Sequence, residues 1–431
     1  MGELFPDRDR PHRTITVNGR APAVSDEQPK TPGGLQACLD ALGYTIRYNV
    51  RNSRPEVRAP GTETWQGMTD RIAARIRAEE IPARFTEAGS NKTLNFRSTI
   101  WEDCLNARLS HVEVDPFLQW LESLKWNGES RLQWSSPWLA HIFDIAPEHL
   151  ALAAWIGRFL VLGAVWRAYK PGTKLDEMPV LIGHKQGDGK STMLAHLFPE
   201  EYRDTWFDDG LRFSADDKTR AEALQGRVIV EASEMVGSTR AERESIKAFV
   251  SRTNDGAVRL AYRRNPEPLP RRCIIAGTSN DPHCLPADPS GNRRFVPITV
   301  KAGPDGMAGV RMYLREFREQ LWAEAVHLYR QGETAWLPES LARDQKKATD
   351  AAVSVDETLE DAVASFLATR EGKAFRAAEC LHHVEAKFGQ ARRLPSTKGL
   401  AVELQRLGCE PMGLKSVQGK KMRLWRPPSI G

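Results

Sequence analysis

The sequence predicts an α/β protein of about three domains, built around one strand–loop–helix segment. The chain has 431 residues, which is too many for a single core of usual size. Short apolar runs, typical of buried strands, alternate with helical patterns and end in glycine, acidic or polar residues. Apolar runs of this kind are expected of parallel strands, because such strands are buried on both faces.

The central segment, Val180 to Thr192, reads Val-Leu-Ile-Gly-His-Lys-Gln-Gly-Asp-Gly-Lys-Ser-Thr. A buried strand, a glycine-rich turn and a helix in this order indicate a phosphate-binding loop, in which backbone N–H groups and a helix N-terminus surround phosphate oxygens. Lys190 would reach the β- and γ-phosphates, and Ser191 would ligate Mg²⁺. The predicted nucleotide contacts are Gly187, Asp188, Gly189, Lys190, Ser191 and Thr192.

The segment departs from the strict loop spacing at the first glycine. That position is His184, and Gly183 lies one residue too early. The loop therefore carries an insertion or a replacement. The alternative interpretation is a glycine-rich turn with a chance Lys-Ser pair, which the flanking strand and helix patterns disfavour.

The composition is that of an ordinary globular protein. The formal net charge of +5 permits a nucleic-acid partner without requiring one. The six cysteines form no CxxC pair and no Cys/His metal spacing, as expected of reduced thiols in the cytosol. No apolar run approaches the roughly 18 residues of a membrane span, and the N-terminus is too charged for a signal peptide. We therefore expect a cytoplasmic protein with no membrane partner.

The region before the central segment is predicted to hold a flexible arm over residues 1–30 and an accessory domain, mainly α or mixed α/β, over residues 31–135. Residue chemistry alone gives this domain no function. Its predicted elements are helices near 35–42, 64–80 and 97–109, a strand over 44–50, and a capped helix that begins at Pro116 and stops at Asn127-Gly128.

A second apolar run, residues 227–234, contains two acids suited to phosphate chemistry, Glu231 and Glu234. The carboxyl end of a buried parallel strand would direct these carboxylates at a nucleotide. One acid would bind Mg²⁺ and the other would polarise the attacking water, and we favour Glu234 for the catalytic role. The alternative is an ordinary strand with surface acids.

A third run, residues 271–280, ends in polar side chains, of which Asn280 could orient water near a γ-phosphate. Farther along, Arg293 and Arg294 follow a glycine turn. Paired arginines in this setting fit an arginine finger, which stabilises charge on a transferring phosphoryl group. A structural Arg–carboxylate pair is the alternative for one of the two.

Between the second and third runs lies a basic segment. Residues 241–250 predict a helix, and basic residues beyond the following turn surround a tyrosine. Basic and aromatic side chains together can follow a phosphate backbone and stack on a base, although these residues taken alone favour a solvated charged loop. The candidate nucleic-acid contacts here are Lys247, Arg252, Arg259, Tyr262, Arg263 and Arg264.

The C-terminal region is predicted to hold a long amphipathic helix over 308–330, a linker over 341–355 and an independent unit over 356–431. Three helices followed by two strands in that unit fit a winged-helix-like domain. Its excess of basic residues favours nucleic acid, and a protein-docking winged helix is the alternative. The candidate DNA contacts are Lys398, Lys420, Lys421 and Arg423.

Several motifs in order resemble the virulence-associated E family of phage and prophage proteins, whose ATPase domain is similar to superfamily 3 helicases and phage primase-helicases. The resemblance covers about residues 115–337. The motifs that carry it are Trp126-Asn-Gly-Glu-Ser-Arg-Leu132, Lys170-Pro-Gly-Thr-Lys174, Gln186-Gly-Asp-Gly-Lys-Ser-Thr192, Glu231-Ala-Ser-Glu234, Ile246-Lys-Ala-Phe-Val-Ser-Arg252, Gly277-Thr-Ser-Asn280 and Gly291-Asn-Arg-Arg-Phe295.

This resemblance implies an AAA+-type P-loop ATPase core over residues 136–340, between the accessory domain and the winged-helix-like domain. It implies ATP and Mg²⁺ as cofactors and a ring of subunits, expected to be a homo-hexamer. The implied roles are Walker A for Lys190 and Ser191, Walker B for Glu231 or Glu234, sensor 1 for Asn280 and the finger for Arg293 or Arg294. The segment after Lys247 resembles pore loops that grip single-stranded DNA.

The expected function is therefore that of an ATP-dependent DNA helicase in the replication of a phage, prophage or mobile element. One alternative is an origin-binding or regulatory protein that uses ATP only as a switch. Another is a degenerate P-loop protein with a structural role, which the retained lysine, acids and arginines disfavour. Residues 1–110 show no primase catalytic set, so we expect any primase to be a separate partner.

Overall fold

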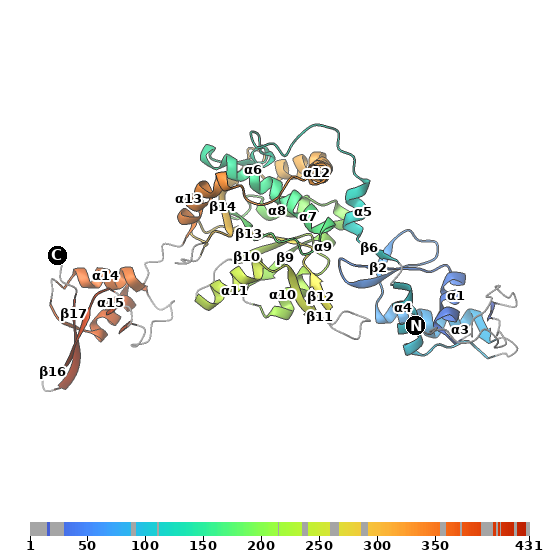
Figure 1. Cartoon of the computed structure of the whole chain (residues 1–431), viewed down its shortest axis with the longest axis horizontal. Helices are drawn as coiled ribbons and strands as arrows, with labels where there is room; N and C mark the ends of the chain where they lie inside the picture. The colour runs from blue at the N-terminus through green and yellow to red at the C-terminus, as the bar shows by residue number, and fades with distance from the viewer. Residues whose placement is uncertain are drawn as a thin grey trace, which may run out of the picture. The chain divides into compact units, whose positions relative to one another are not determined.

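The computed structural model shows a mixed α/β protein (Figure 1). The chain divides into two compact units, Met1–Ala352 and Val353–Gly431. The first unit holds one hydrophobic core in its N-terminal part and another in its central region. The structure describes residues 15–17, 30–87, 92–109, 112–213, 215–234, 240–258, 267–285, 292–353, 359–370, 373–388, 400–401, 404–405, 407–417 and 420–427.

The N-terminal part contains a four-stranded sheet of order β4-β3-β2-β6, in which β6 is parallel to β2 and the other neighbours are antiparallel. The predicted helical face over 35–42 and the alternation over 44–50 are confirmed as α1 and β2. The elements are β1 (Ile15–Val17), α1 (Pro32–Leu42), β2 (Thr45–Asn49), β3 (Arg54–Arg58), β4 (Trp65–Gly67), α2 (Asp70–Arg75), a π-helical turn (Ile76–Glu80), α3 (Ile81–Arg84), β5 (Phe85–Glu87), α4 (Ser98–Leu109) and β6 (Glu113–Val114).

The helix predicted over 64–80 begins later and continues farther. Residues 65–67 form a strand because they pair with β3. The helix begins only at Asp70, where the Thr69 side chain accepts a hydrogen bond from the N–H of Ile72. The periodicity alone does not reveal this cap, so the predicted start was wrong by about two turns.

The central core also begins earlier than predicted. Helix α5 (Pro116–Ser123) starts at its Asp115 cap as expected, but it ends at Ser123 instead of Asn127-Gly128. Its Phe117 and Leu121 are buried in the central core and do not belong to the N-terminal one. The boundary placed at residue 135 is therefore too late by one helix.

The segment after α5 is held against the long helix α12 (Gly306–Arg330). The carboxylate of Glu324 accepts hydrogen bonds from the Ser130 hydroxyl at 2.5 Å, the Arg131 N–H at 2.6 Å and the Leu132 N–H at 3.1 Å. Glu324 is only 2% exposed. The chain has already left the helical path before residue 127, and Gln320 of α12 bonds the Lys125 carbonyl and the Asn127 N–H there, at 3.1 and 2.9 Å.

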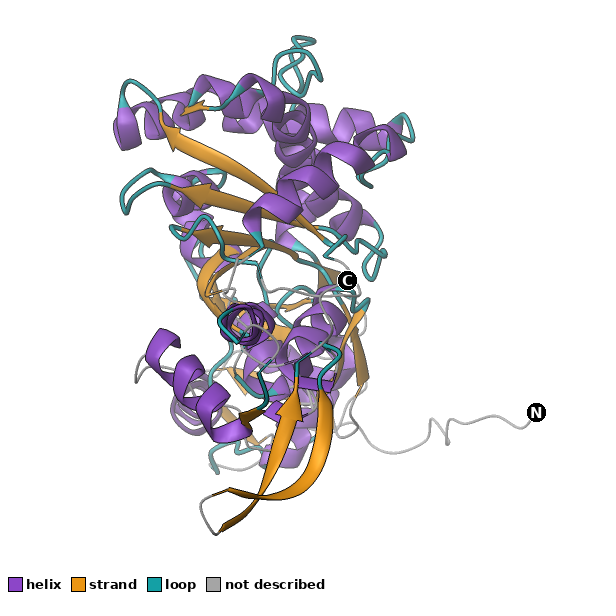
Figure 2. Ribbon diagram, turned by 90° about the vertical axis from the view of Figure 1, so that its left-hand side faces the viewer, coloured by secondary structure: helices purple, strands orange, loops and turns teal. Residues whose placement is uncertain are grey.

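The central sheet has the order β7-β14-β8-β13-β10-β9. Its five strands from β14 to β9 are parallel, and β7 runs antiparallel to β14 at one edge (Figure 2). All six residues of β8 are buried, as expected for a strand in the middle of such a sheet. The strands are β7 (Phe143–Asp144), β8 (Met178–Gly183), β9 (Phe207–Arg212), β10 (Ile229–Glu234), β13 (Ile274–Ser279) and β14 (Phe295–Ala302).

Figure 1 shows α6, α7, α8 and α12 on one side of this sheet and α10 and α11 on the other. A separate hairpin, β11 (Asn254–Val258) and β12 (Glu267–Pro270), follows α11. The helices of the central region are α6 (Leu150–Arg158), a π-helical turn (Phe159–Gly163), α7 (Ala164–Tyr169), α8 (Lys190–His196), α9 (Glu200–Trp206), α10 (Asp217–Leu224), α11 (Arg240–Val250), α12, and short 3₁₀ turns at Trp138–His141, Pro147–His149 and Glu339–Leu341.

One helical run, Pro147–Tyr169, is long and apolar enough to cross a membrane by length and composition. In the structure, 78% of its apolar window is buried inside the protein. This run packs into the central core, where Trp155, Phe159 and Leu162 are among its buried members. A core helix accounts for its composition.

Arg51 joins the N-terminal part to the central region. Its guanidinium forms a two-point ion pair with Asp115, at 2.8 and 2.9 Å, and donates to the carbonyls of Arg227 and Arg272 at 3.2 and 3.0 Å. Its side chain is 1% exposed. Arg227 and Arg272 precede β10 and β13, so the contact is made at the edge of the sheet where the parallel strands begin.

The linker predicted over 341–355 is mostly a helix, α13 (Ala342–Ala352). Its Gln345 and Thr349 side chains donate to the carbonyl of Phe295, at 2.7 and 3.2 Å. These contacts bind α13 to the start of β14, so it belongs to the first unit.

The second unit contains two described helices and a three-stranded sheet of order β15-β17-β16. Phe366, Phe375 and Trp425 are members of its small core. Part of the third predicted helix lies outside the described residues. The elements are α14 (Leu359–Ala368), β15 (Phe375–Arg376), α15 (Ala377–Phe388), β16 (Glu410–Val417) and β17 (Lys420–Arg426).

Candidate functional site

The loop between β8 and α8 lies at the edge of the sheet where the parallel strands end. Gly187 and Gly189 adopt φ angles of 93° and 90°, which glycine reaches without strain. Gly183 ends β8 against the loop, and a Cβ there would lie 2.1 Å from Nζ of Lys190. The glycines thus let the backbone fold closely around the Lys190 side chain.

Asp188 organises the irregular first half of the loop. Its carboxylate accepts hydrogen bonds from the N–H groups of His184 and Lys185, at 2.9 and 3.1 Å. Asp188 is 2% exposed, although the neighbouring His184 and Lys185 side chains are exposed. The residues that break the strict spacing are therefore held in a defined turn by a buried carboxylate.

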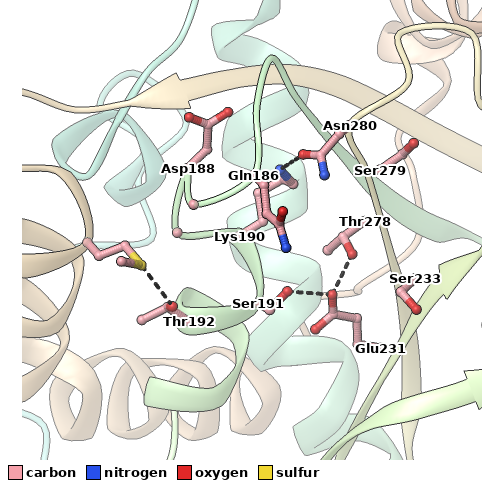
Figure 3. A pocket seen from close by; sticks show the side chains of 13 residues that line it. Gln186, Asp188, Lys190, Ser191, Thr192, Glu231, Ser233, Thr278, Ser279 and Asn280 are labelled. Carbon is pink, nitrogen blue, oxygen red and sulfur yellow. Dashed lines mark hydrogen bonds between the residues drawn. The ribbon is translucent and has the colours of Figure 1, made fainter.

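Figure 3 shows how side chains from three neighbouring segments converge beside this loop. Nζ of Lys190 donates to Oδ1 of Asn280 at 2.8 Å, and the Ser191 hydroxyl donates to Oε1 of Glu231 at 2.7 Å. The Thr278 hydroxyl donates to the same carboxylate oxygen. Because β8, β10 and β13 are parallel neighbours, their carboxyl ends bring these groups together.

Burial shifts the pKa values of Glu231 and Lys190 in opposite directions. Burial raises the pKa of Glu231 above its ordinary value, while hydrogen bonds from Thr278 and Ser191 lower it in part. Burial lowers the pKa of Lys190, and the charges of Asp188 and Glu231 oppose that change. Each group would therefore gain stability from a counter-charge placed beside it, such as a cation at Glu231 or an anion at Lys190.

These groups line a cavity of about 340 Å³. The second carboxylate oxygen of Glu231, Oε2, is buried and has no hydrogen-bond partner in the part of the chain that the structure describes. Glu231 and Ser191 together offer the oxygen ligands that Mg²⁺ prefers. The cavity is lined by Gln186, Gly187, Asp188, Gly189, Lys190, Ser191, Thr192, Glu231, Ser233, Thr278, Ser279, Asn280 and Met307.

A family model, described as the virulence-associated protein E-like domain, matches residues 121–354, more than half of the chain. The chain belongs to this family. The matched residues include the loop, strands β10 and β13 beside the cavity, and helix α12. The resemblance noted from the motifs is thereby confirmed.

Two solved apo structures of the NrS-1 C-terminal region are similar to this chain over most of its length. They are 13% and 14% identical in sequence, with TM-scores of 0.43 and 0.44, and each match covers 92% of this chain and 99% of the other. Similarity at this level does not establish a shared function. No curated protein matches the sequence.

Two predicted site residues lie outside the cavity, and the side chain of a third is not described. Glu234 ends β10, where its backbone pairs with Arg212, but its side chain is not described. Arg293 and Arg294 precede β14, which starts beside the first residue of β8. The arginines therefore lie at the opposite edge of the sheet from the cavity and cannot complete it within one chain.

The candidate DNA contacts of the central region differ in their surroundings. Lys247 is only 4% exposed, because it lies on α11 among the buried Ile246, Phe249 and Val250. In this structure it is not available to DNA at the surface, contrary to the prediction. Arg252 is partly exposed and pairs with Asp217 at 3.1 Å.

The remaining candidate DNA contacts have no described side chains. Arg259, Tyr262, Arg263, Arg264 and Lys398 lie outside the described residues. Lys420, Lys421 and Arg423 lie on β17, but their side chains are not described. Their assignment to nucleic acid stays a prediction.

The structure adds Thr278 and Met307 to the site. Thr278 was visible in the sequence only as one of three polar residues at a strand end, and its bond to Glu231 identifies it as a positioning residue. Met307 lies in the first turn of α12, and its sulfur accepts from the Thr192 hydroxyl at 3.8 Å. A methionine far along the sequence carries no signal for such a site, because only the return of α12 over the loop brings it there.

Proposed function

We propose that this protein is an ATP hydrolase that moves along DNA, a superfamily-3-like helicase or translocase in the replication of a phage, prophage or mobile element. The observation that carries the proposal is the meeting of Lys190, Ser191 and Glu231 at the carboxyl edge of the sheet, over a glycine-rich loop. A lysine, a hydroxyl and a buried carboxylate in this arrangement suit a nucleoside triphosphate with Mg²⁺. Membership in the virulence-associated protein E-like family supports the proposal.

Each residue would contribute a separate part of the reaction. Lys190 would exchange its bond to Asn280 for phosphate oxygens, since an ammonium group favours an anionic partner over a neutral amide. Ser191 and Glu231 would hold Mg²⁺, which supplies neutralisation of phosphate charge when bound. Asn280, once released, would orient the attacking water, and Glu234 would accept a proton from that water.

The proposed assembly is an AAA+-type ring, expected to be a homo-hexamer, in which Arg293 and Arg294 serve the site of a neighbouring subunit. Their place at the opposite edge of the sheet is compatible with this role and with no role in their own cavity. Single-stranded DNA would pass the basic segment around Tyr262. The second unit, proposed as winged-helix-like, would bind duplex DNA, and a separate primase would supply primers.

The test compares wild type with Lys190→Ala in ATP hydrolysis and in unwinding of a forked DNA. We expect Lys190→Ala to lower both by about 100-fold or more, as loss of a group that stabilises transition-state charge does. Lys174→Ala, which removes an exposed lysine at the other edge of the sheet, is the matched control. Unwinding by Lys190→Ala at the wild-type rate would refute the proposal.

A second outcome would favour a different function. If the wild-type protein binds duplex DNA only with ATP, yet DNA does not stimulate hydrolysis and forks are not unwound, the protein is an ATP-switched origin-binding or regulatory module. The structure is compatible with this alternative to the extent that the second unit is a separate compact body. Duplex binding measured with and without ATP distinguishes the two.

A further inference from the structure

A second cavity, of about 470 Å³, lies beside the end of β14. It is lined by two short segments, residues 140–145 around β7 and residues 302–304 at the end of β14. Its volume falls in the range of small-ligand sites, roughly 300–1,000 Å³. None of its residues takes part in the site described above.

This cavity lies at the same edge of the sheet as the loop. Strand β14 is parallel to β8 and aligns Val300 with Gly183, so Ala302 lies two residues beyond the end of β8. Strand β7 pairs with β14 at Lys301 and Ala302. Two strand spacings, about 10 Å, therefore separate β7 from the loop strand, a span comparable to that from the phosphates to the base of a nucleotide.

The two cavities share one wall. The chain passes from Gly303 and Pro304, which line the second cavity, directly to Met307, which lines the first. Met307 and Val310 lie over Gly189 of the loop, so the start of α12 is held against the phosphate-binding segment. A ligand anchored at the loop can thus extend along residues 302–307 into the second cavity.

The chemistry of the second cavity suits a nucleoside. Ile142, Phe143 and Ile145 are buried and give it an apolar floor, while His141 and Asp144 are exposed at its surface. The His141 ring stacks on Tyr313 of α12, with centroids 5.7 Å apart and planes 11° from parallel. A flat ring fixed in this way can stack on a base, and a carboxylate can accept hydrogen bonds from ribose hydroxyls.

Gly303 keeps this floor close to the neighbouring strand. A Cβ at Gly303 would lie 2.7 Å from the carbonyl oxygen of Ile142, so the two backbones approach each other more closely than any other residue permits. The position of the floor is therefore set by glycine at the point where β14 ends.

We propose that the second cavity binds the purine base and ribose of the nucleotide whose phosphates bind at Lys190, with His141 stacked on the base and Asp144 bonded to the ribose hydroxyls. This inference rests on the proposed function, because it assigns the nucleoside half of the same ligand. It makes a separate claim, that the site is built for a nucleotide and not for any polyphosphate.

The experiment titrates the full chain calorimetrically with ATP and with inorganic tripolyphosphate, each with Mg²⁺. We expect wild type to bind ATP at least ten-fold more tightly than tripolyphosphate, and His141→Ala to weaken ATP by about ten-fold, within the range for loss of one stacked base. Tripolyphosphate should bind the variant as it binds wild type. His149→Ala, outside the cavity, should change neither ligand.

A second variant tests the ribose contact. Wild type should bind ATP more tightly than 2′,3′-dideoxy-ATP, and Asp144→Asn should reduce that difference. Equal binding of ATP and tripolyphosphate by wild type, or unchanged ATP binding by both variants, overturns the inference and leaves the proposed function standing. If neither ligand binds, or if Lys190→Ala binds tripolyphosphate like wild type, the proposed function fails and this inference fails with it.

Discussion

Replacing Thr278 with valine removes one of the two hydroxyls that donate to Glu231 and nearly preserves the shape of the side chain. Glu231 is 1% exposed, and burial already raises its pKa, whereas the two hydroxyls lower it. A hydrogen bond to a charged group contributes about 1.5–3 kcal/mol. The free energy of ionising Glu231 therefore increases by up to that amount in Thr278→Val, and the pKa of Glu231 rises further.

Only ionised Glu231 can ligate Mg²⁺, so the effect depends on pH. The acid limb of the pH–rate profile for ATP hydrolysis should move to higher pH in Thr278→Val. On that limb the rate should fall about ten-fold, since about 1.4 kcal/mol corresponds to a factor of ten, and it should recover in alkaline solution. Ser279→Ala is the control, because the Ser279 hydroxyl bonds to Asp281 and not to Glu231. An unmoved acid limb in Thr278→Val would refute the reasoning.

Three further substitutions have defined outcomes. Glu324→Gln should destabilise the protein by about 1–3 kcal/mol, because an amide cannot accept all three of the buried hydrogen bonds. Glu319→Ala, on the exposed side of the same helix, should leave the free energy of unfolding unchanged, and urea denaturation measures both variants. Arg51→Ala should cost about 3–5 kcal/mol by leaving a buried carboxylate with fewer partners. The exposed Arg54→Ala should cost about 0.5 kcal/mol or less in the same assay. Asp188→Asn keeps an acceptor for the loop N–H groups but removes a charge that opposes phosphate, so calorimetric ATP affinity should rise about five-fold, corresponding to about 1 kcal/mol.

The parts of the fold that the sequence could predict are those set by local patterns. Apolar runs ending in glycine, acidic or polar residues marked β8, β10 and β13, and the Asp115-Pro116 pair marked the start of α5. The errors occurred where distant contacts decide. The segment after α5 is bonded by Gln320 of α12, and the supposed linker is a helix whose Gln345 side chain bonds the carbonyl of Phe295.

The candidate site, like the fold, could be predicted where local patterns decide and not where distant contacts decide. Lys190, Ser191, Glu231 and Asn280 could be predicted to meet because the carboxyl ends of parallel strands share one edge. The partner of each residue could not be predicted, since pairing depends on strand order and rotamers. The burial of Lys247 illustrates the limit, because a lysine within a polar-looking helix gives no sign that the face it occupies packs against the core.

The cavity and the arginine pair lie at opposite edges of the central sheet, and this separation predicts how hydrolysis depends on protein concentration. The cavity beside Lys190 lies at the carboxyl edge, whereas Arg293 and Arg294 lie where β14 begins. Six residues of strand β8 separate the edges, about 20 Å at 3.3 Å per residue, which no arginine side chain spans. If these arginines complete the reaction, they do so in a second copy of the chain. The rate of hydrolysis per chain should then rise with protein concentration in the wild type. In the double variant Arg293→Ala/Arg294→Ala the rate should stay at the low value of the dilute wild-type protein. A wild-type rate per chain that does not change between concentrations giving monomer and concentrations giving oligomer would exclude a shared site.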